Sequence, residues 1–252
     1  MSKSNKTKSI ELASSIKTIT DVFVYANKII KTVQKSIDTD PICCIEINKT
    51  NDKTVELEPK NVISGSKAVT TFLELLRQEQ KQALIDKVKG CGPFLKLADH
   101  FKSNDTDIFF LNSKEVSRVK YENVDIIHLK TVDIKEHLSN FDLTCCRCSM
   151  NFESTKFWVS LQCLYTMLTG NCFLPKYLES LEKFKTVYVS ANGEYTSYVN
   201  NHKNTKCSKM FARTQLRIEK YTERGYKFEY VETDRVMPFI NSNHMSSYTG
   251  GY

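Results

Sequence analysis

The segment 104–111 constrains this chain more than any other, because it is an apolar, strand-like run that begins with two carboxylates. Asp105 and Asp107 stand one residue apart, and Ile108 and Phe110 follow them. Successive side chains of a β-strand point to opposite faces, so the two acids are expected to project side by side. Adjacent like charges are unfavourable unless a positive group lies between them, and a Mg²⁺ ion held by carboxylates and phosphates is one such group. A strand that begins at a solvated loop is the simpler alternative.

Composition and charge narrow the class of protein. The chain has 252 residues with a hydrophobic fraction of 40%, enough for one large domain or two modest ones with a packed core. No apolar run reaches the length of a membrane span, and the polar, basic N-terminus shows no secretory signal. Nine irregularly spaced cysteines favour a reduced, cytoplasmic compartment over a disulfide framework. The net charge of +7 favours a polyanionic partner, and the missing span argues against a membrane.

The hydrophobic pattern predicts an α/β (α+β) fold, in which a mixed sheet is flanked by helices and followed by a helical C-terminal region. The predicted strands are 42–47 and 55–57 as a hairpin, 105–111, 124–129, 141–146 and 226–231. The predicted helices lie within 10–37, 70–76, 78–88, 94–101, 157–168, 176–184 and 206–224. The predicted organisation is a disordered basic tail over 1–10, a core over 11–150 with a helical insertion near 78–101, a helical region over 151–240 packed on the core, and a flexible tail over 241–252.

Two further features carry candidate chemistry. Gly65 and Ser66 stand between a short apolar segment and a predicted helix. The missing β-carbon lets the backbone approach a phosphate there, and the helix N-terminus offers free N–H groups. Asp142 is a lone carboxylate between Phe141 and Leu143, and an acid in such an apolar segment is costly to bury without a partner.

Four short motifs occur in order along roughly residues 60–228. They are Ser64-Gly65-Ser66, Asp105-Thr106-Asp107-Ile108-Phe109, Phe141-Asp142-Leu143-Thr144-Cys145-Cys146 and Lys220-Tyr221-Thr222-Glu223-Arg224-Gly225. The combination resembles the nucleotidyltransferase superfamily, whose fold is that of DNA polymerase β. It is most similar to uncharacterised nucleotidyltransferase-like proteins of large DNA viruses, which implies a viral protein of the host cytoplasm or the virion.

The resemblance implies metal-dependent transfer of a nucleoside monophosphate from a nucleoside triphosphate to an acceptor, which may be RNA, protein or a small molecule. Asp105 and Asp107 would bind Mg²⁺ or Mn²⁺ with the triphosphate, and Asp142 would hold a second ion and help to activate the attacking hydroxyl. The remaining nucleotide-binding candidates are Gly65, Ser66, Lys67, Lys220 and Arg224. Two features depart from the superfamily pattern: forty residues separate Gly65 from Asp105, and Thr106 replaces an apolar residue.

A basic stripe is predicted along the helix 206–224. Its cations recur every three or four residues and fall within an arc of about 80°. They are Lys206, Lys209, Arg213, Arg217, Lys220 and Arg224. Such a stripe suits a nucleic-acid backbone or a polyphosphate, and a solvated amphipathic face is the simpler interpretation.

Two functional hypotheses of different classes therefore stand beside the enzyme. A catalytically inactive nucleotidyltransferase-like scaffold, which contacts nucleic acid through the basic helix, is favoured by the long segment between Gly65 and Asp105. A basic packaging protein explains the charge but not the carboxylates in apolar segments. Cys145 and Cys148 form a single Cys-x-x-Cys without a second pair, so we interpret them as small buried residues rather than as zinc ligands.

Overall fold

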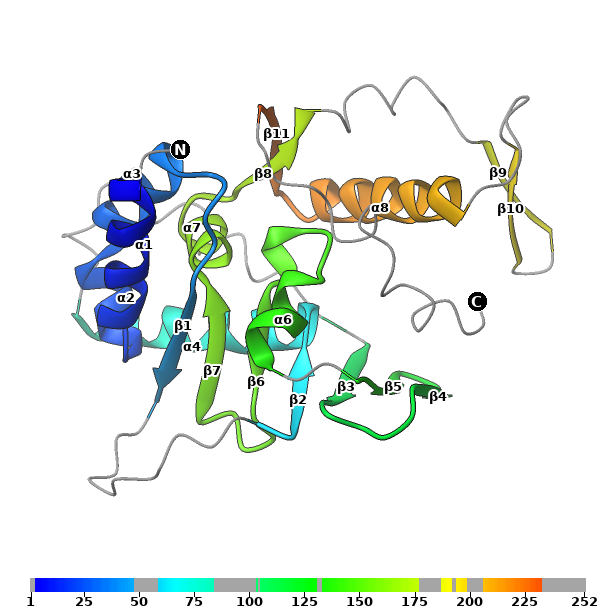
Figure 1. Cartoon of the computed structure of the whole chain (residues 1–252), viewed down its shortest axis with the longest axis horizontal. Helices are drawn as coiled ribbons and strands as arrows, with labels where there is room; N and C mark the ends of the chain where they lie inside the picture. Colours follow the sequence, from blue (N-terminus) through cyan, green and yellow to red (C-terminus); the bar gives the residue numbers. More distant parts are fainter. Residues whose placement is uncertain are drawn as a thin grey trace.

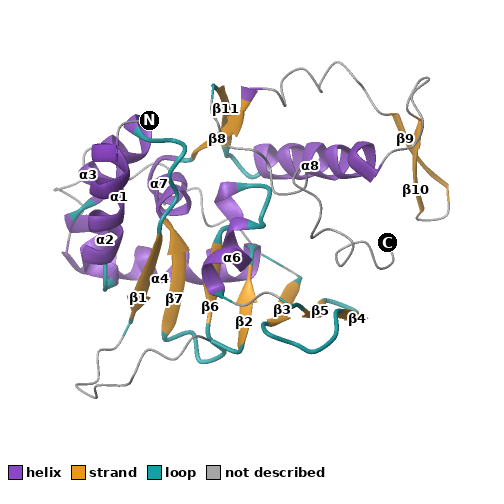
Figure 2. Cartoon of the chain, viewed as in Figure 1, coloured by secondary structure: helices purple, strands orange, loops and turns teal. Residues whose placement is uncertain are grey.

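The computed structural model describes residues 3–47, 59–83, 103, 105–130, 133–176, 187–191, 194–198 and 206–232. Within these ranges seven strands form one mixed sheet in the order β1-β7-β6-β2-β3-β5-β4 (Figure 1). The strands are β1 (Ile42–Glu46), β2 (Asn61–Ser64), β3 (Thr106–Phe110), β4 (Ser117–Tyr121), β5 (Val124–His128), β6 (Cys148–Met150) and β7 (Lys156–Ser160). Helices flank this sheet, so the predicted fold class is confirmed (Figure 2).

The helices and the two small sheets complete the described elements. The helices are α1 (Lys3–Ser15), α2 (Ile19–Val24), α3 (Ala26–Lys35), α4 (Ser66–Ala83), α6 (Ile134–Ser139), the 3₁₀ helix η2 (Thr144–Cys146), α7 (Leu161–Thr169) and α8 (Lys206–Glu223). Strand β8 (Asn171–Pro175) pairs in parallel with β11 (Lys227–Val231), and β9 (Val187–Ala191) pairs with β10 (Glu194–Tyr198) in antiparallel fashion. None of the described helices is both long and apolar enough to cross a membrane.

The two faces of the sheet support separate apolar clusters. Successive residues of β2 alternate between them: Val62 belongs to the cluster under α6, whereas Ile63 packs against the larger cluster shared with α1 to α4 and α7. Phe109 of β3 stands opposite Val62 and lies in the α6 cluster as well. Asp107 has the same parity as Phe109, so its side chain also belongs to the α6 face of the sheet.

The N-terminal segment differs from the prediction. Residues 1–10 were expected to form a disordered tail, yet α1 begins at Lys3 and the Ser9 side chain is buried. Ser9 Oγ lies 3.1 Å from Thr39 Oγ1, beyond the end of α3, and Leu12 and Ile16 are fully buried. The helix forms because its apolar positions cover the core, although its polar residues dominate the composition of the segment.

Two boundaries in the middle of the chain also differ. Segment 141–146 was predicted as a strand, but a loop at Phe141–Leu143 leads into η2 instead. Segment 157–168 was predicted as a helix throughout, but its first part is β7, a central strand buried on both faces. Because a fully buried strand is a continuous apolar run, it cannot be told from a buried helix by periodicity alone. Residues 151–160 therefore belong to the core sheet and not to a separate helical region.

The other predictions either agree with the structure or concern residues that the structure does not describe. Strand β1 forms as expected and pairs with β7. Helix α8, strand β11 and the left-handed Gly225 (φ +91°) after the helix are confirmed. Helix α4 extends to Ala83, past the predicted break at 77. The segments 55–57, 84–102, 177–186 and 233–252 lie outside the described residues.

Candidate functional site

The turn between β2 and α4 is joined directly to the start of β3. Ser66 Oγ, in the first residue of α4, lies 2.8 Å from Ser103 Oγ, and Ser103 Oγ donates to the Asp105 carbonyl oxygen at 2.8 Å. Ser66 is therefore the donor to Ser103. The turn at Gly65 and the segment that begins at Asp105 are forty residues apart in sequence. These two hydrogen bonds nevertheless place the N-terminus of α4 beside the acidic segment.

Gly65 makes that proximity possible. Its φ of +76° is the left-handed conformation that glycine adopts without cost, and it turns the chain from β2 into α4. A Cβ atom at this position would lie 3.4 Å from Phe141 Cε1 and 3.9 Å from Asp107 Oδ2. The space that a side chain at Gly65 would occupy is therefore bordered by Phe141 and by the Asp107 carboxylate. The first turn of α4 follows, with N–H groups that no intrahelical carbonyl accepts.

Asp107 is the most perturbed acid of the site. Burial raises its pKa above the ordinary value of 3.8, and the nearby carboxylates of Asp125 and Asp105 raise it further. Arg118 and Arg217 act in the opposite direction on the same pKa. Asp105 is exposed and directly precedes the first residue of β3. Two carboxylates and two guanidinium groups thus lie within electrostatic reach of Asp107.

Asp125 is a site residue that the sequence prediction missed. It stands directly opposite Asp107 in the register of the parallel strands β3 and β5, and it is buried. The signal was present, because Asp125 is a lone acid between Val124 and Ile126, just as Asp142 is between Phe141 and Leu143. Two candidates with the same local pattern competed for the third position, and only the strand pairing distinguishes them.

Arg118 of β4 holds Asp125 in a two-pronged ion pair. Arg118 Nε donates to Asp125 Oδ1 at 2.7 Å, and its Nη2 donates to Oδ2. A bidentate guanidinium–carboxylate pair is strong and fixes both side chains. The buried charge of Asp125 is therefore compensated within the described part of the chain.

Asp142 pairs with helix α8. Its Oδ2 accepts hydrogen bonds from Thr214 Oγ1 at 3.0 Å and Arg217 Nη1 at 2.6 Å, both on α8. Its side chain is 9% exposed and that of Arg217 is 52% exposed. The lone carboxylate does have the partner that its burial requires, but this partner is a helix from the far end of the chain. Asp142 thus anchors α8 to the core.

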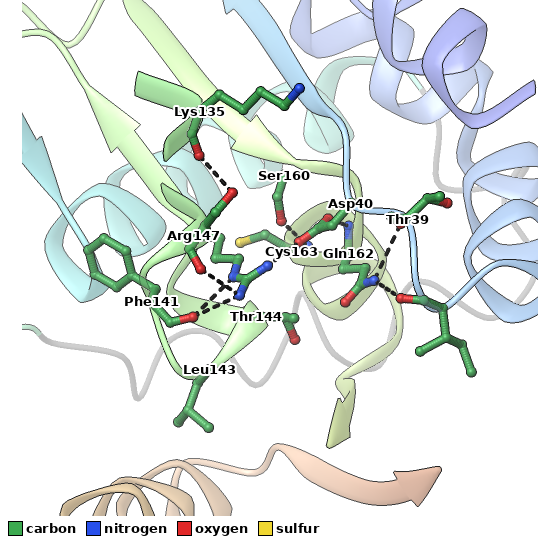
Figure 3. A network of polar contacts seen from close by, with 12 residues as sticks. Thr39, Asp40, Lys135, Phe141, Leu143, Thr144, Arg147, Ser160, Gln162 and Cys163 are labelled. Atoms are coloured by element: carbon green, nitrogen blue, oxygen red, sulfur yellow. Dashed lines mark hydrogen bonds and ion pairs between the residues drawn. The ribbon is translucent and has the colours of Figure 1, made fainter. Parts of the chain in front are cut away.

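The loop that carries Asp142 is itself held by Arg147, whose side chain is 5% exposed (Figure 3). The Arg147 guanidinium donates to the carbonyl oxygens of Ser139 and Phe141 at 2.9–3.2 Å and to Asp40 Oδ2 at 2.9 Å. The other oxygen of Asp40 accepts from the Gln162 backbone N–H in the first turn of α7. This network keeps Phe141 against Gly65 and Asp142 toward α8.

The described side chains of α8 begin at Thr214, and they divide between a packing face and cations. Thr214, Ile218 and Tyr221 are buried, which confirms the predicted packing face. Arg217 is the cation that reaches the acids, whereas Lys220 is exposed and the Arg224 guanidinium carbon lies 5.2 Å over the Tyr221 ring. The side chains of Lys206, Lys209 and Arg213 lie outside the described residues.

A buried polar network lies beneath the turn. Ser64 Oγ lies 2.6 Å from Ser149 Oγ and 2.9 Å from His137 Nε2. Burial lowers the pKa of His137 to about 3, so the imidazole is neutral at physiological pH. His137 also packs against Phe109 and Phe141. The network braces the last residue of β2 immediately before Gly65.

Two predicted contacts with nucleotide or metal remain predictions. Lys67 is half-buried in the first turn of α4, and its carbonyl accepts hydrogen bonds from the Thr70 and Thr71 hydroxyls. Among the described residues, no group of three or more His, Cys, Asp or Glu side chains is arranged to hold a metal ion. Cys145 and Cys148 are buried thiols, as interpreted from the sequence.

The donor set nevertheless fits a hard divalent cation that arrives with a phosphate ligand. Mg²⁺ is commonly bound in proteins by one or two carboxylates, with substrate phosphates and waters as its other ligands. Asp105 and Asp107 supply carboxylate oxygens at one place. Burial, and after it repulsion from Asp125 and Asp105, raises the pKa of Asp107, and a bound cation would favour its ionised form.

Comparisons with known proteins add no name to this arrangement. No protein-family model, curated protein or solved structure matches the chain significantly.

Proposed function

We propose that this chain binds a nucleoside triphosphate together with Mg²⁺ or Mn²⁺ at the Gly65 turn and transfers the nucleoside monophosphate to an acceptor hydroxyl. The observation that carries the proposal is that the space left open by the missing side chain of Gly65 borders the Asp107 carboxylate, 3.9 Å from where a Cβ atom would stand. A backbone turn that can receive phosphates and an acid that can receive their cation meet there, on one face of the sheet. Such a meeting is what a metal–triphosphate complex requires.

The residues of the chain divide the work in this proposal. The N-terminus of α4 donates its free backbone N–H groups to phosphate oxygens, and the Ser66 hydroxyl can do the same only when it releases Ser103 Oγ. Asp105 and Asp107 would orient the triphosphate through a shared cation. The bound ion neutralises phosphate charge and stabilises the leaving group. In the transfer, the acceptor hydroxyl gives its proton to a carboxylate of the site and its oxygen bonds to the α-phosphorus, while the bond from this phosphorus to pyrophosphate breaks. Arg217 faces the same acids and is placed to meet phosphate charge.

Asp125 takes the third acidic position in this proposal, in place of Asp142. It shares the α6 face with Asp107 because the two are direct partners in a parallel pair of strands. The two hydrogen bonds from Arg118 fix the orientation of the Asp125 side chain. Asp142 becomes a positioning residue that holds α8, and thereby Arg217, beside the site.

The second candidate function is nucleotide binding without transfer, and the Arg118 ion pair favours it. A carboxylate already bound by a guanidinium at both oxygens is poorly available to a second cation or to an acceptor proton. The chain would then use the turn and Asp107 to bind a triphosphate as a scaffold or sensor. Both candidates share the binding step and differ only in the release of pyrophosphate.

A thermal-shift experiment tests the shared step. We expect the melting temperature of the wild-type chain to rise when Mg²⁺ or Mn²⁺ and a nucleoside triphosphate are added together, because a ligand that binds only the folded state stabilises it. The double substitution Asp105→Asn/Asp107→Asn should abolish the rise. A matched control, Glu115→Gln/Glu153→Gln, removes two exposed carboxylates elsewhere and should keep it. A wild type that gains nothing from metal plus triphosphate contradicts both candidates.

Pyrophosphate release then separates the two. Incubation with each labelled triphosphate should yield pyrophosphate and a labelled acceptor or labelled chain if transfer occurs. A thermal shift without pyrophosphate supports the binding function instead. In that case the Arg118→Gln variant shows whether the ion pair is the cause, because freeing Asp125 should then permit release.

A further inference from the structure

A second basic feature lies away from the candidate site, on the N-terminal helices. A cavity of about 460 Å³ opens between α1 and α3 and is lined by eight residues, four of which are lysines. The lysines are Lys8 of α1 and Lys28, Lys31 and Lys35 of α3, and all four are exposed. Amide and hydroxyl side chains complete the lining, without a carboxylate among the described residues. We call these four side chains and the cavity the lysine groove.

The lysines of α3 form a row along one side of the helix. Lys28, Lys31 and Lys35 are separated by three and four residues, which places them on one face over a length of about 10 Å. Ile29 and Val33 occupy the opposite side and are buried in the core. The row is therefore held in place by the packing of the helix, and Lys8 faces it from α1.

None of the ion pairs found between described side chains engages these four lysines. Four cations around one concavity repel one another, and the groove has no acid of its own to relieve this repulsion. The arrangement thus favours a ligand with several negative charges at regular spacing. A strand of nucleic acid carries one phosphate per 3.4 Å of axis, so a row about 10 Å long spans about three phosphates.

We propose that the lysine groove binds the phosphodiester backbone of single-stranded nucleic acid. Its concave shape admits a strand, whereas a membrane surface needs a flat or convex basic patch. Lys28 Nζ lies 5.7 Å from the centroid of the half-buried Tyr25 ring, so an aromatic surface borders the row. Grooves that combine cations with aromatic rings are typical of single-strand binding.

The position of the groove gives this inference a consequence for the candidate site. Helix α1 packs against β1, at one edge of the sheet, while β3, β5 and β4 form the other edge (Figure 1). A small anion cannot contact both places, but a polymer can. If the proposed transfer occurs, the groove therefore identifies nucleic acid as the acceptor. Binding in the groove does not itself depend on that transfer.

Fluorescence anisotropy with a labelled single strand of about 20 nucleotides, longer than typical single-strand site sizes, tests the groove without metal or triphosphate. The test variant is Lys8→Gln/Lys28→Gln/Lys31→Gln/Lys35→Gln. The matched control removes the same charge at exposed positions outside the groove, with Lys60→Gln/Lys114→Gln/Lys135→Gln/Lys227→Gln. Circular dichroism verifies the fold of both, and the single Lys31→Glu substitution replaces the test variant if it does not fold.

We expect the groove variant to bind the oligonucleotide at least about tenfold more weakly near 0.1 M salt. The magnitude of the slope of log K against log salt should fall by about 2, since each of about three single-strand phosphate contacts contributes about 0.7. The control should stay within about threefold of the wild type, whose slope it should nearly keep. Equal losses in the two variants, or wild-type affinity in the groove variant, would overturn the proposal. So would binding to phosphatidylserine vesicles by a chain that does not bind the oligonucleotide.

Discussion

Asp107 of β3 and Asp125 of β5 stand opposite each other as register partners in two parallel strands, on the face of the sheet that α6 covers. Parallel neighbours bring side chains of the same parity close together, so the pairing forces two carboxylates into one place. The chain tolerates this through Arg118, which binds Asp125, and through the raised pKa of Asp107. The repulsion that remains at Asp107 is the property that the predictions below exploit first.

Replacement of Asp107 by Asn should stabilise the fold at neutral pH. Burial and Asp125 raise the pKa of Asp107 in the folded state, so ionisation opposes folding above that pKa. The cost disappears below the ordinary value of 3.8, where Asp107 is protonated in both states. We expect the melting temperature of Asp107→Asn to exceed that of the wild type at pH 7, by about 2–4 °C per kcal/mol gained.

The difference should shrink as the pH falls toward 4 and vanish below it. Thermal melts of both proteins from pH 7 to pH 3.5 measure it. Glu115→Gln, at an exposed acid, should show no such difference at either end of the range. A variant that is less stable than the wild type at pH 7 would show that Asp107 is already compensated.

Replacement of Gly65 by Ala should impair nucleotide binding beyond its cost in stability. The left-handed φ of +76° disfavours any β-carbon by about 1–2 kcal/mol, and the new methyl group would press on Phe141. Gly170 has the same φ of +76° at the end of α7 and serves as the matched control. Both Ala variants should lose similar stability in urea unfolding, but only Gly65→Ala should lose the thermal shift with metal and triphosphate. Equal shifts in both would remove the turn from the site.

Replacement of Arg217 by Gln should weaken triphosphate binding with little loss of stability. The Arg217 side chain is about half exposed, so its pair with Asp142 contributes less than about 1 kcal/mol. It is also the α8 cation that acts on Asp107, so its removal should reduce triphosphate affinity by about tenfold. Lys220→Gln, one turn along the same helix, is the control and should bind normally. Isothermal titration calorimetry measures the triphosphate affinity of both variants. It distinguishes a specific role of Arg217 from a general effect of removing one positive charge.

Replacement of Arg147 by Met should be the most destabilising change among these. It leaves the buried Asp40 carboxylate and two carbonyl oxygens without their donor, and breaking a buried pair from one side costs about 3–5 kcal/mol. Lys156→Met removes a cation that pairs with Glu46 at 3.5 Å near the surface, and should cost less than about 1 kcal/mol. Urea unfolding of the two variants compares them directly. Similar losses of unfolding free energy in the two variants would mean that the Arg147 network does not hold the loop at Phe141.

Local patterns in the sequence predicted much of the architecture. Helical periodicity over 206–224 and the glycine after it correspond to α8 and the left-handed Gly225. The alternating or apolar runs around Ile42, Asp107 and Ile126 correspond to β1, β3 and β5. These features follow from side-chain periodicity and from the conformational freedom of glycine, which depend only on neighbours along the chain.

The tertiary structure decided which residues belong to the candidate site. Asp125 and Asp142 look alike in sequence, since each is a single acid between apolar residues, and the sequence prediction chose Asp142. The structure pairs Asp125 with Asp107 and gives Asp142 to Arg217. Likewise, the forty residues between Gly65 and Asp105 gave no sign that Ser66 and Ser103 are in contact. The sequence by itself determined the elements that local periodicity defines, such as β3, β5 and α8, and where acids stand on them. Which acids meet depended on strand register and on the docking of α8, because these arise from contacts between residues far apart in the chain.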